Sequence, residues 1–247
     1  MERLVQSLLQ RILGFERYLF WFSRLKIRTL HRDKNEGDVI RFISDLPRDG
    51  VVLDIGANIG IMTVLIAKRV TGGTVHAFEP IPENFRALTK IVHHYGLKNV
   101  VLHEMAIGEG AGTLEMIMPE QENVRMQGLS HVVTPETADE PGERYSVPQA
   151  RLDDLEFLGD ELVTGIKIDV EDHEQYVFKG ATAIIEKSRP LIYSELGDNE
   201  NRTFSFKLFK DMDYEIGVLV DDEVVGFEPT SHDKHNFFLC PGPLSRY

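Results

Sequence analysis

Apolar runs of strand length alternate with helical patterns through the middle of the chain. Residues 51–55, 74–78 and 100–105 have the length and composition of buried β-strands. Between them, residues 61–70 and 82–95 repeat apolar residues at helical spacing. Strands that alternate with helices in this way form a parallel sheet covered by helices on both faces. The pattern therefore predicts an α/β domain that begins near the first of these runs.

The alternation resumes in the second half of the chain. Further strands are predicted over residues 165–170, 190–196, 214–220 and 236–240, with helices over residues 173–187 and 204–211. Between the two halves, residues 113–118 predict a short strand. Residues 120–143 are polar and contain two prolines, which predicts a long loop. Long loops inside compact domains are usually functional, so we expect this one to border the substrate site.

The segment before the first strand has a different character. Apolar residues recur at helical spacing over residues 4–22, and residues 35–46 predict a second short helix that ends at Pro47. Residues 1–34 carry eight Lys or Arg against three Asp or Glu, although the whole chain has a net charge of −13. Such a helix packs on the domain or on a second subunit, or it lies on an anionic membrane surface with Trp21 inserted. Both alternatives stay open.

Composition narrows the class of protein. A net charge of −13 argues against nucleic-acid binding through a broad basic face. The single cysteine, Cys240, excludes an internal disulfide framework and is expected to be a buried thiol in a strand. Charges are spaced through the first residues, so we expect no secretory signal there, and no apolar run reaches about 20 residues. We therefore expect a cytoplasmic protein, with peripheral membrane contact as a variant of that location.

The first two predicted strands end in acids that flank a glycine turn. Asp54 lies in the first strand, Gly56 and Gly60 bound the turn, and Glu79 follows the second strand. An acid about 20 residues beyond a glycine turn is placed to bind ribose hydroxyls in nucleotide-binding folds. The sequence therefore predicts a ribose-bearing cofactor at the carboxyl ends of these strands.

The same turn departs from the pattern that binds a pyrophosphate. A dinucleotide-binding turn reads G-x-G-x-x-G, but here the second and third glycine positions hold Asn58 and Ile61. S-adenosylmethionine has a ribose and no phosphate, so it does not need those glycines. The turn favours this cofactor, and a nicotinamide-dependent oxidoreductase is the alternative, which NADH binding would reveal.

Several motifs together resemble the FkbM-family methyltransferases. They are D-I-G-A-N-I-G at residues 54–60, F-E-P at 78–80 with Asn84, K-I-D-V-E at 167–171, and K-G-A at 179–181. Residues 151–155 and 236–238 also resemble segments of that family. The match covers residues 51–241, and the combination is specific although no single piece is.

The resemblance implies a class I methyltransferase fold. This is a Rossmann-like, mostly parallel, seven-stranded sheet with helices on both faces and an antiparallel last strand. It also implies S-adenosylmethionine as donor and O-methylation of a hydroxyl on a sugar, glycan or natural-product-like small molecule. One position departs from the family, which commonly has glycine where this chain has Asp172. We predict an N-terminal helical extension over residues 1–48 and a methyltransferase domain over residues 49–247.

The cofactor is expected to lie at the ends of the first two strands. Asp54 and the turn residues are expected to surround its amino-acid part, and Glu79 its ribose hydroxyls. Three further residues are expected to flank the adenine, with Asn84 nearby. The turn residues are Gly56, Ala57, Asn58 and Gly60, and those near the adenine are Pro80, Ile81 and Ala106.

The strand end over residues 167–173 is the candidate catalytic cluster. Asp169 ends a buried strand near the expected methyl position and could accept the proton of an alcohol. Glu171 or His173 could do the same from the following turn, although His173 could equally cap the next helix. Lys167 is expected to pair with a buried acid. The same carboxylates could also bind Mg²⁺ through oxygen ligands.

We therefore predict an S-adenosylmethionine-dependent O-methyltransferase whose partner is a small-molecule or glycan acceptor. The N-terminal helix leaves a homodimer or a peripheral membrane contact open. A rival hypothesis from another class is a non-catalytic protein that keeps the fold and uses its basic N-terminal helix to recruit a partner or a membrane. It predicts cofactor binding without turnover.

Overall fold

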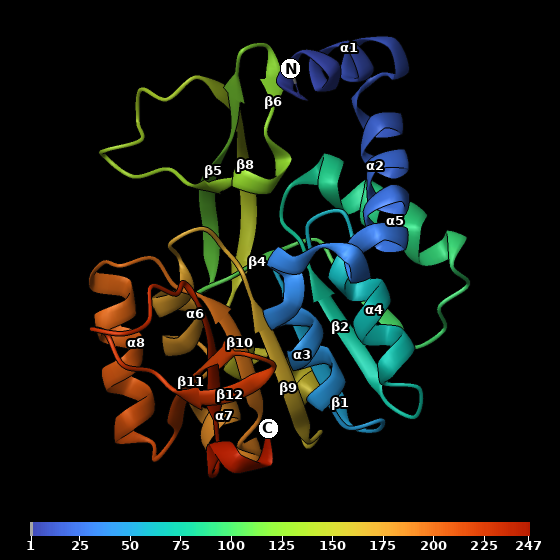
Figure 1. Ribbon diagram of the computed structural model, residues 1–247. Coiled ribbons are helices and arrows are strands. Elements are labelled where there is room, and N and C mark those ends of the chain that lie inside the picture. Colours follow the sequence, from blue (N-terminus) through green and yellow to red (C-terminus); the bar gives the residue numbers. More distant parts are fainter. Residues whose placement is uncertain (1) are drawn as a thin grey trace.

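An eight-stranded sheet forms the centre of the molecule in the computed structural model, which describes residues 2–247 (Figure 1). Its members are β1 (Val51–Ile55), β2 (Thr74–Phe78), β3 (Val100–His103), β9 (Val163–Ile168), β10 (Leu191–Glu195), β11 (Glu215–Val220), β12 (Glu223–Gly226) and β13 (Asn236–Cys240). Their order across the sheet is β12-β11-β13-β10-β9-β1-β2-β3. The strands from β10 to β3 pair in parallel, whereas β13 runs antiparallel to both β10 and β11.

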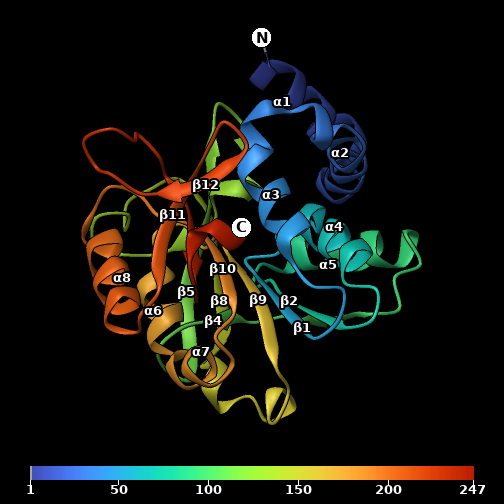
Figure 2. The ribbon, with the colours of Figure 1, turned by 60° about the horizontal axis from the view of Figure 1, so that its bottom comes forward.

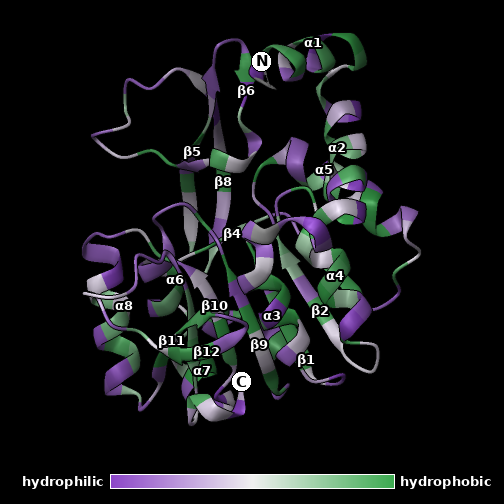
Figure 3. Ribbon diagram, in the orientation of Figure 1, coloured by the Kyte–Doolittle hydropathy of each residue, from purple (hydrophilic) through white to green (hydrophobic). Residues whose placement is uncertain are grey.

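The predicted strands of this sheet are confirmed. All five residues of β1 are buried, as are four of the five in β2, because helices cover both faces. This double burial makes the central strands hydrophobic along most of their length (Figure 3). Strand β12 is an addition to the predicted seven. It forms a hairpin with β11 through Asp221 and Asp222, whose φ angles of 49° and 65° are left-handed.

Three helices lie on each face of the sheet. Phe42 of α3 and Ile66 of α4 share a core cluster with one face, and α5 packs beside them through Leu88. Phe178 of α6, Ile185 of α7 and other apolar residues pack on the opposite face with α8. The bounds are α3 (Gly37–Asp45), α4 (Ile61–Arg69), α5 (Pro82–His94), α6 (Glu174–Lys179), α7 (Thr182–Ser188) and α8 (Glu200–Asp211).

The N-terminal extension adds helices α1 (Glu2–Leu13) and α2 (Phe15–Thr29). Helix α2 lies beside α4 and α5 (Figure 2), and Leu19 is buried against Ala87 and its neighbours. Within residues 2–247, no helix combines the length and apolar character of a membrane-spanning segment. Residue 1 of the predicted extension lies outside the described residues, and the domain boundary stays a prediction.

Two helices that the pattern predicted as continuous are broken at glycine. The predicted helix over residues 4–22 is divided at Gly14, whose φ of 75° is left-handed. The predicted helix over residues 173–187 is divided near Gly180. A Cβ at Gly180 would lie 2.0 Å from the carbonyl oxygen of Gly108, so the break permits a close approach of two backbones. Periodicity alone did not reveal either break.

A second sheet replaces most of the predicted long loop. Strands β5 (Gly112–Gln121) and β8 (Gly142–Ala150) form a long antiparallel pair. The sheet is completed by β4 (Ala106–Ile107), β6 (Val124–Arg125) and β7 (His131–Val132). The loop prediction was therefore wrong except over residues 133–141. The strand predicted over residues 113–118 is confirmed as part of β5. The other strands were missed because most are very short, and they pair with distant partners rather than within a local pattern. The sheet stands over one end of the central sheet (Figure 1).

Candidate active site

The turn after β1 has a backbone that only glycine fits at two positions. Gly56 has a φ of 74°, and a Cβ there would lie 1.9 Å from the carbonyl oxygen of Asp169. Gly60 has a φ of 82°, and its Cβ would lie 2.8 Å from the side chain of Leu88. Between them Asn58 is also left-handed, with a φ of 48°. The turn after β1 therefore lies close to the end of β9 at Gly56 and close to α5 at Gly60.

Glu79 is the buried acid beside this turn. Its Oε2 accepts a hydrogen bond from the Asn58 backbone N–H at 2.8 Å, and its Oε1 accepts one from the Ile81 N–H at 2.9 Å. The side-chain amide of Asn84 lies 3.4 Å from Oε1. Burial raises the pKa of Glu79 to about 7, although these hydrogen bonds lower it. Oε1 accepts two of these hydrogen bonds and Oε2 accepts one, so Oε2 retains an acceptor position for a ligand hydroxyl.

A polar cleft opens at this point, and an apolar one adjoins it. Residues from the turn, the end of β2 and the end of β9 line the polar cleft, together with Gln127, Gly128 and Ser130 from the second sheet. The apolar cleft is lined by Pro80 and Ala106, among others. Of the predicted cofactor residues, those that line one or both clefts are Gly56, Asn58, Glu79, Pro80, Ile81, Asn84 and Ala106. Ala57 is buried in the turn.

A short 3-10 segment of the second sheet covers the polar cleft. The carbonyl oxygen of Gln127 accepts hydrogen bonds from the side-chain amides of Asn84 at 3.3 Å and Asn58 at 3.5 Å. This segment, η3 (Gln127–Leu129), comes from the predicted loop, and that loop was expected to border the site. No residue of η3 was singled out from the sequence. In the sequence, this segment was marked only by its position, as part of a polar stretch between the two halves of the domain.

Asp54 and Lys167 lie behind the cleft rather than in its lining. Asp54 is fully buried, and its Oδ2 accepts a hydrogen bond from the Thr63 hydroxyl at 2.6 Å. The Lys167 ammonium lies 3.6 Å from Asp54 and 3.4 Å from Asp169, and it donates to the Gly56 carbonyl at 2.8 Å. The predicted pairing of Lys167 with a buried acid is confirmed. Both side chains are therefore joined to the cleft only through the residues that they contact.

The charge of Lys167 survives its burial. Desolvation lowers the pKa of Lys167, but the carboxylates of Asp169 and Asp54 outweigh that effect and raise the pKa overall. The ammonium is thus a fixed positive charge between two acids. It orients the side chain of Asp169, which lines the polar cleft.

The segment after β9 adopts a backbone that ordinary residues avoid. Glu171 and Asp172 have φ angles of 49° and 67° in succession. Glycine adopts a left-handed conformation at little cost, whereas the Cβ of Asp172 makes it unfavourable. Asp tolerates this conformation better than most residues, and here the Asn199 side chain donates a hydrogen bond to Asp172 at 2.6 Å. Strained backbone of this kind concentrates at functional sites.

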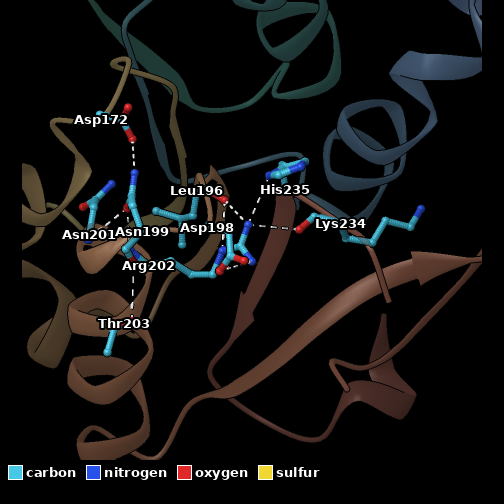
Figure 4. A network of polar contacts seen from close by, with 9 residues as sticks. All are labelled: Asp172, Leu196, Asp198, Asn199, Asn201, Arg202, Thr203, Lys234 and His235. Atoms are coloured by element: carbon cyan, nitrogen blue, oxygen red, sulfur yellow. Dashed lines mark hydrogen bonds and ion pairs between the residues drawn. The ribbon is translucent and has the colours of Figure 1, made fainter. Parts of the chain in front are cut away.

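The start of α8 holds this strained segment and its neighbours (Figure 4). Asn199 caps α8 by accepting from the backbone N–H groups of Asn201 and Arg202. Arg202 in turn donates to the carbonyl oxygens of Leu196 and Lys234 and contacts Nδ1 of His235 at 3.1 Å. One helix end therefore fastens the loops that follow β9 and β10 and the loop that precedes β13.

Burial favours the neutral form of both Glu171 and His173, so Glu171 tends to keep its proton and His173 tends to lose one. Burial raises the pKa of Glu171 to about 8, and the nearby carboxylates of Asp169 and Glu195 add to the shift. Burial lowers the pKa of His173 to about 4. His173 occupies the N-cap position of α6, but within residues 2–247 its side chain makes no capping hydrogen bond. It lines the apolar cleft instead, so of the four candidate catalytic residues only Glu171 and Asp169 line the polar cleft.

The polar groups beside the cleft suit an organic cofactor better than a metal ion. Two buried amide oxygens beside the cleft, Asn58 Oδ1 and Asn84 Oδ1, have no hydrogen-bond partner among residues 2–247. Such acceptors, together with Glu79, fit a ligand that offers hydroxyl and amino donors. Across the same residues, no group of three or more His, Cys, Asp or Glu is arranged as metal ligands, so the predicted Mg²⁺ site is not supported.

Comparisons with known proteins agree with this arrangement. Residues 54–229 match the model of the methyltransferase FkbM domain. The chain is 27% identical to methyltransferase sdnD of Sordaria araneosa over 162 residues, which cover 56% of this chain and 62% of that protein. It is 31% identical over 154 residues to the 31-O-demethyl-FK506 methyltransferase FkbM of Streptomyces tacrolimicus, covering 53% of this chain and 58% of that protein. The chain thus spans less than two thirds of the length of either relative.

A solved structure shows the same fold. The crystal structure of methyltransferase FkbM from Methylobacillus flagellatus KT matches with a TM-score of 0.52 at 16% identity, over 78% of this chain and 44% of that chain. The sheet order and the cleft at its strand ends define the fold of a class I methyltransferase. Within that class, the chain belongs to the FkbM methyltransferase family. The predicted resemblance and fold class are confirmed, and the roles of individual site residues stay predictions.

Proposed function

We propose that the protein is an S-adenosylmethionine-dependent O-methyltransferase that acts on a hydroxyl of a glycan or a natural-product-like small molecule. The observation that carries the proposal is Glu79, a buried acid aimed by two backbone N–H groups into a cleft that has no dinucleotide glycine pattern. The Streptomyces relative is named a 31-O-demethyl-FK506 methyltransferase, which refers to methylation at an oxygen and supports the choice of a hydroxyl acceptor.

The chain offers separate surroundings for the parts of this cofactor. Glu79 would accept hydrogen bonds from the ribose hydroxyls, and Asn58 and Asn84 would offer their free amide oxygens. The apolar cleft beside Ala106 and Pro80 suits the adenine ring. Bound there, the cofactor supplies a methyl group already activated on a sulfonium. The protein then mainly has to align the acceptor and receive its proton.

Two carboxylates face the place where the acceptor would lie. Asp169, fixed by Lys167, would hold the acceptor hydroxyl in line with the methyl group. Glu171 has a pKa raised to about 8, which makes it a stronger base than an ordinary carboxylate once it is ionised. It is our candidate for the group that takes the hydroxyl proton as the new C–O bond forms.

Calorimetry and mass spectrometry test the proposal at two levels. S-adenosylhomocysteine should bind the purified protein, NADH should not, and Glu79→Ala should weaken binding at least tenfold. Extracts with and without the active protein should then differ by metabolites or glycans that carry one added CH₂ group. Absence of S-adenosylhomocysteine binding would overturn the cofactor assignment. Binding without any methylated product would support the non-catalytic alternative.

The assignment of the base has its own test. Glu171→Gln should lower kcat at least tenfold and leave the Kd of S-adenosylhomocysteine within about twofold, because the residue acts on the acceptor. Unchanged turnover in this variant would transfer the role to Asp169.

A further inference from the structure

Helix α1 packs on the molecule with its polar face. Arg3 forms an ion pair with Glu122 at 2.9 Å, and the Ser7 hydroxyl donates to the Asn123 carbonyl at 3.3 Å. Gln10 donates to the Arg125 carbonyl and accepts from the Arg125 N–H, both at 3.1 Å. Residues 3, 7 and 10 recur at helical spacing, so they share one face of α1. That face rests on the second sheet at β6.

The opposite face of α1 is apolar and points to solvent. Leu4 and Ile12 are 77% and 68% exposed, and the face also includes Val5, Leu8 and Leu9. An ordinary surface helix has the reverse arrangement, with its apolar face on the core. Figure 3 shows α1 at the outer edge of the molecule, with hydrophobic residues along it. In the part of the chain that the structure describes, seven of the twelve exposed large apolar side chains belong to α1 and α2, which marks a concentrated patch.

Helix α2 extends this pattern with an aromatic anchor and basic residues. Arg17, Trp21, Leu25 and Arg28 are all exposed and recur at helical spacing. The guanidinium of Arg24 lies 4.6 Å from the Trp21 ring. Trp together with Arg and exposed apolar residues is the composition of helices that lie in the headgroup region of a membrane.

Charge decides between a membrane and a second copy of the chain. Residues 1–34 carry a surplus of positive charge, so a symmetric pairing of two such segments would bring like charges together. An anionic lipid surface complements that charge.

We propose that the exposed apolar face of α1 binds the protein reversibly to an anionic membrane surface. The apolar side chains enter the interface, and Arg11, Arg17 and Arg28 contact lipid phosphates. This binding is a property of the extension and does not depend on the proposed methyl transfer.

Vesicle flotation with the full chain tests this directly. The protein should float with phosphatidylcholine vesicles that contain phosphatidylglycerol and stay in solution with phosphatidylcholine alone. The double variant Leu8→Asp with Ile12→Asp should lose at least tenfold in partitioning. A matched control, Val101→Asp with Leu162→Asp, changes exposed apolar residues outside α1 and α2 and should partition like the unmodified protein.

A variant with two positive charges removed measures the electrostatic contribution to membrane binding. Each Arg near an anionic surface is worth about fivefold in partitioning, so Arg11→Gln with Arg17→Gln should lower it by roughly 25-fold. Circular dichroism and thermal melting of all variants check that the domain still folds. Failure of the unmodified protein to bind anionic vesicles, or equal binding by the Leu8 and Ile12 variant, would overturn the proposal. So would a dimer in light scattering that this variant converts to a monomer, because a second copy would then cover the face.

Discussion

At the scale of residues, the acids of the site differ because their surroundings differ. Asp54 is enclosed and paired with Lys167, whereas Glu79 is enclosed but hydrogen-bonded mainly to backbone N–H groups. Glu171 lies among other carboxylates and has a raised pKa. One functional group, the carboxylate, can thus serve as a fixed charge in Asp54, as a hydrogen-bond acceptor for a ligand in Glu79 and as a proton acceptor in Glu171.

The pKa of Glu79 predicts how cofactor binding depends on pH. Ribose hydroxyls donate to the ionised carboxylate, so affinity for S-adenosylhomocysteine should fall up to tenfold per pH unit below about 7. Glu79→Gln should bind at least tenfold more weakly and lose this dependence. Calorimetry from pH 5.5 to 8.5 measures both, with Asp169→Asn as the control that keeps the dependence. A flat profile in the unmodified protein would show that Glu79 does not bind the cofactor as its anion.

A pair of glycine variants separates backbone strain from crowding. Gly56 and Gly96 are both left-handed, but a Cβ at Gly56 would collide with the Asp169 carbonyl, while one at Gly96 would meet open space beyond its chain neighbours among residues 2–247. Gly96→Ala should cost about 1 kcal/mol of unfolding free energy, and Gly56→Ala clearly more, at least about 3 kcal/mol. Urea denaturation gives both values. Equal losses would mean that the turn can relax away from β9.

At the scale of elements, helix ends and strand ends are joined by specific side chains. Asn199 both caps α8 and holds Asp172, so one residue connects helix formation to the shape of the segment after β9. The hairpin of β5 and β8 carries η3 over the polar cleft in a comparable way. These connections explain why the site is built from elements that lie far apart in the sequence.

Two substitutions at Asn199 distinguish its roles. Asn199→Ala removes the cap and the bond to Asp172, and it should lower the unfolding free energy by about 1 to 2 kcal/mol. Asn199→Asp keeps a capping oxygen but places two carboxylates together, so it should retain most of the stability while raising the KM for the acceptor. Denaturation and kinetics measure the two effects. An unchanged KM in both variants would show that the Asp172 segment does not bind the acceptor.

The cover formed by η3 predicts a change in hydrogen exchange. Cofactor bound in the polar cleft contacts the underside of this segment and restricts its opening, so the backbone amides of residues 127–130 should exchange more slowly with S-adenosylhomocysteine. Mass-spectrometric exchange with and without the ligand measures this. Residues 133–141, which lie in the same insertion without regular structure, serve as the internal control. Equal slowing in both segments would indicate a general stabilisation instead of contact.

At the scale of the whole molecule, three buried acids make stability depend on pH in an unusual direction. Burial raises the pKa of Glu79 and Glu174 to about 7 and that of Glu171 to about 8. Between the ordinary value of 4.5 and these values, the folded protein holds protons that the unfolded chain releases. Their contribution to stability is therefore fully present below pH 4.5 and is lost as the pH rises towards 8.

Thermal melting between pH 5 and pH 8 should show this loss. The ligand-free protein should melt at a lower temperature at pH 8 than at pH 5.5, with Glu79 alone contributing on the order of 2 kcal/mol to the difference. Glu79→Gln should reduce the difference, because a neutral amide has no proton to release. The exposed Glu200→Gln provides a control and should leave the difference as it is. A melting temperature that rises over this range would contradict the burial of these acids.

What the sequence alone determined is mostly local. The strands from β1 to β3, the turn from Gly56 to Gly60 and the position of Glu79 followed from apolar periodicity and from the conformations that glycine permits. These features could be predicted because each depends on residues close together in the chain, where burial on both faces and a left-handed φ leave a visible pattern.

Only the tertiary structure decided which way side chains point and which distant segments meet. It placed Asp54 and Lys167 behind the cleft, brought η3 over Asn58 and Asn84, and turned the apolar face of α1 to solvent. The second sheet depends on pairing between β5 and β8, which no local periodicity encodes. The physical reason is that packing and hydrogen-bond partners are chosen among all parts of the folded chain, whereas periodicity reports only whether a residue is buried.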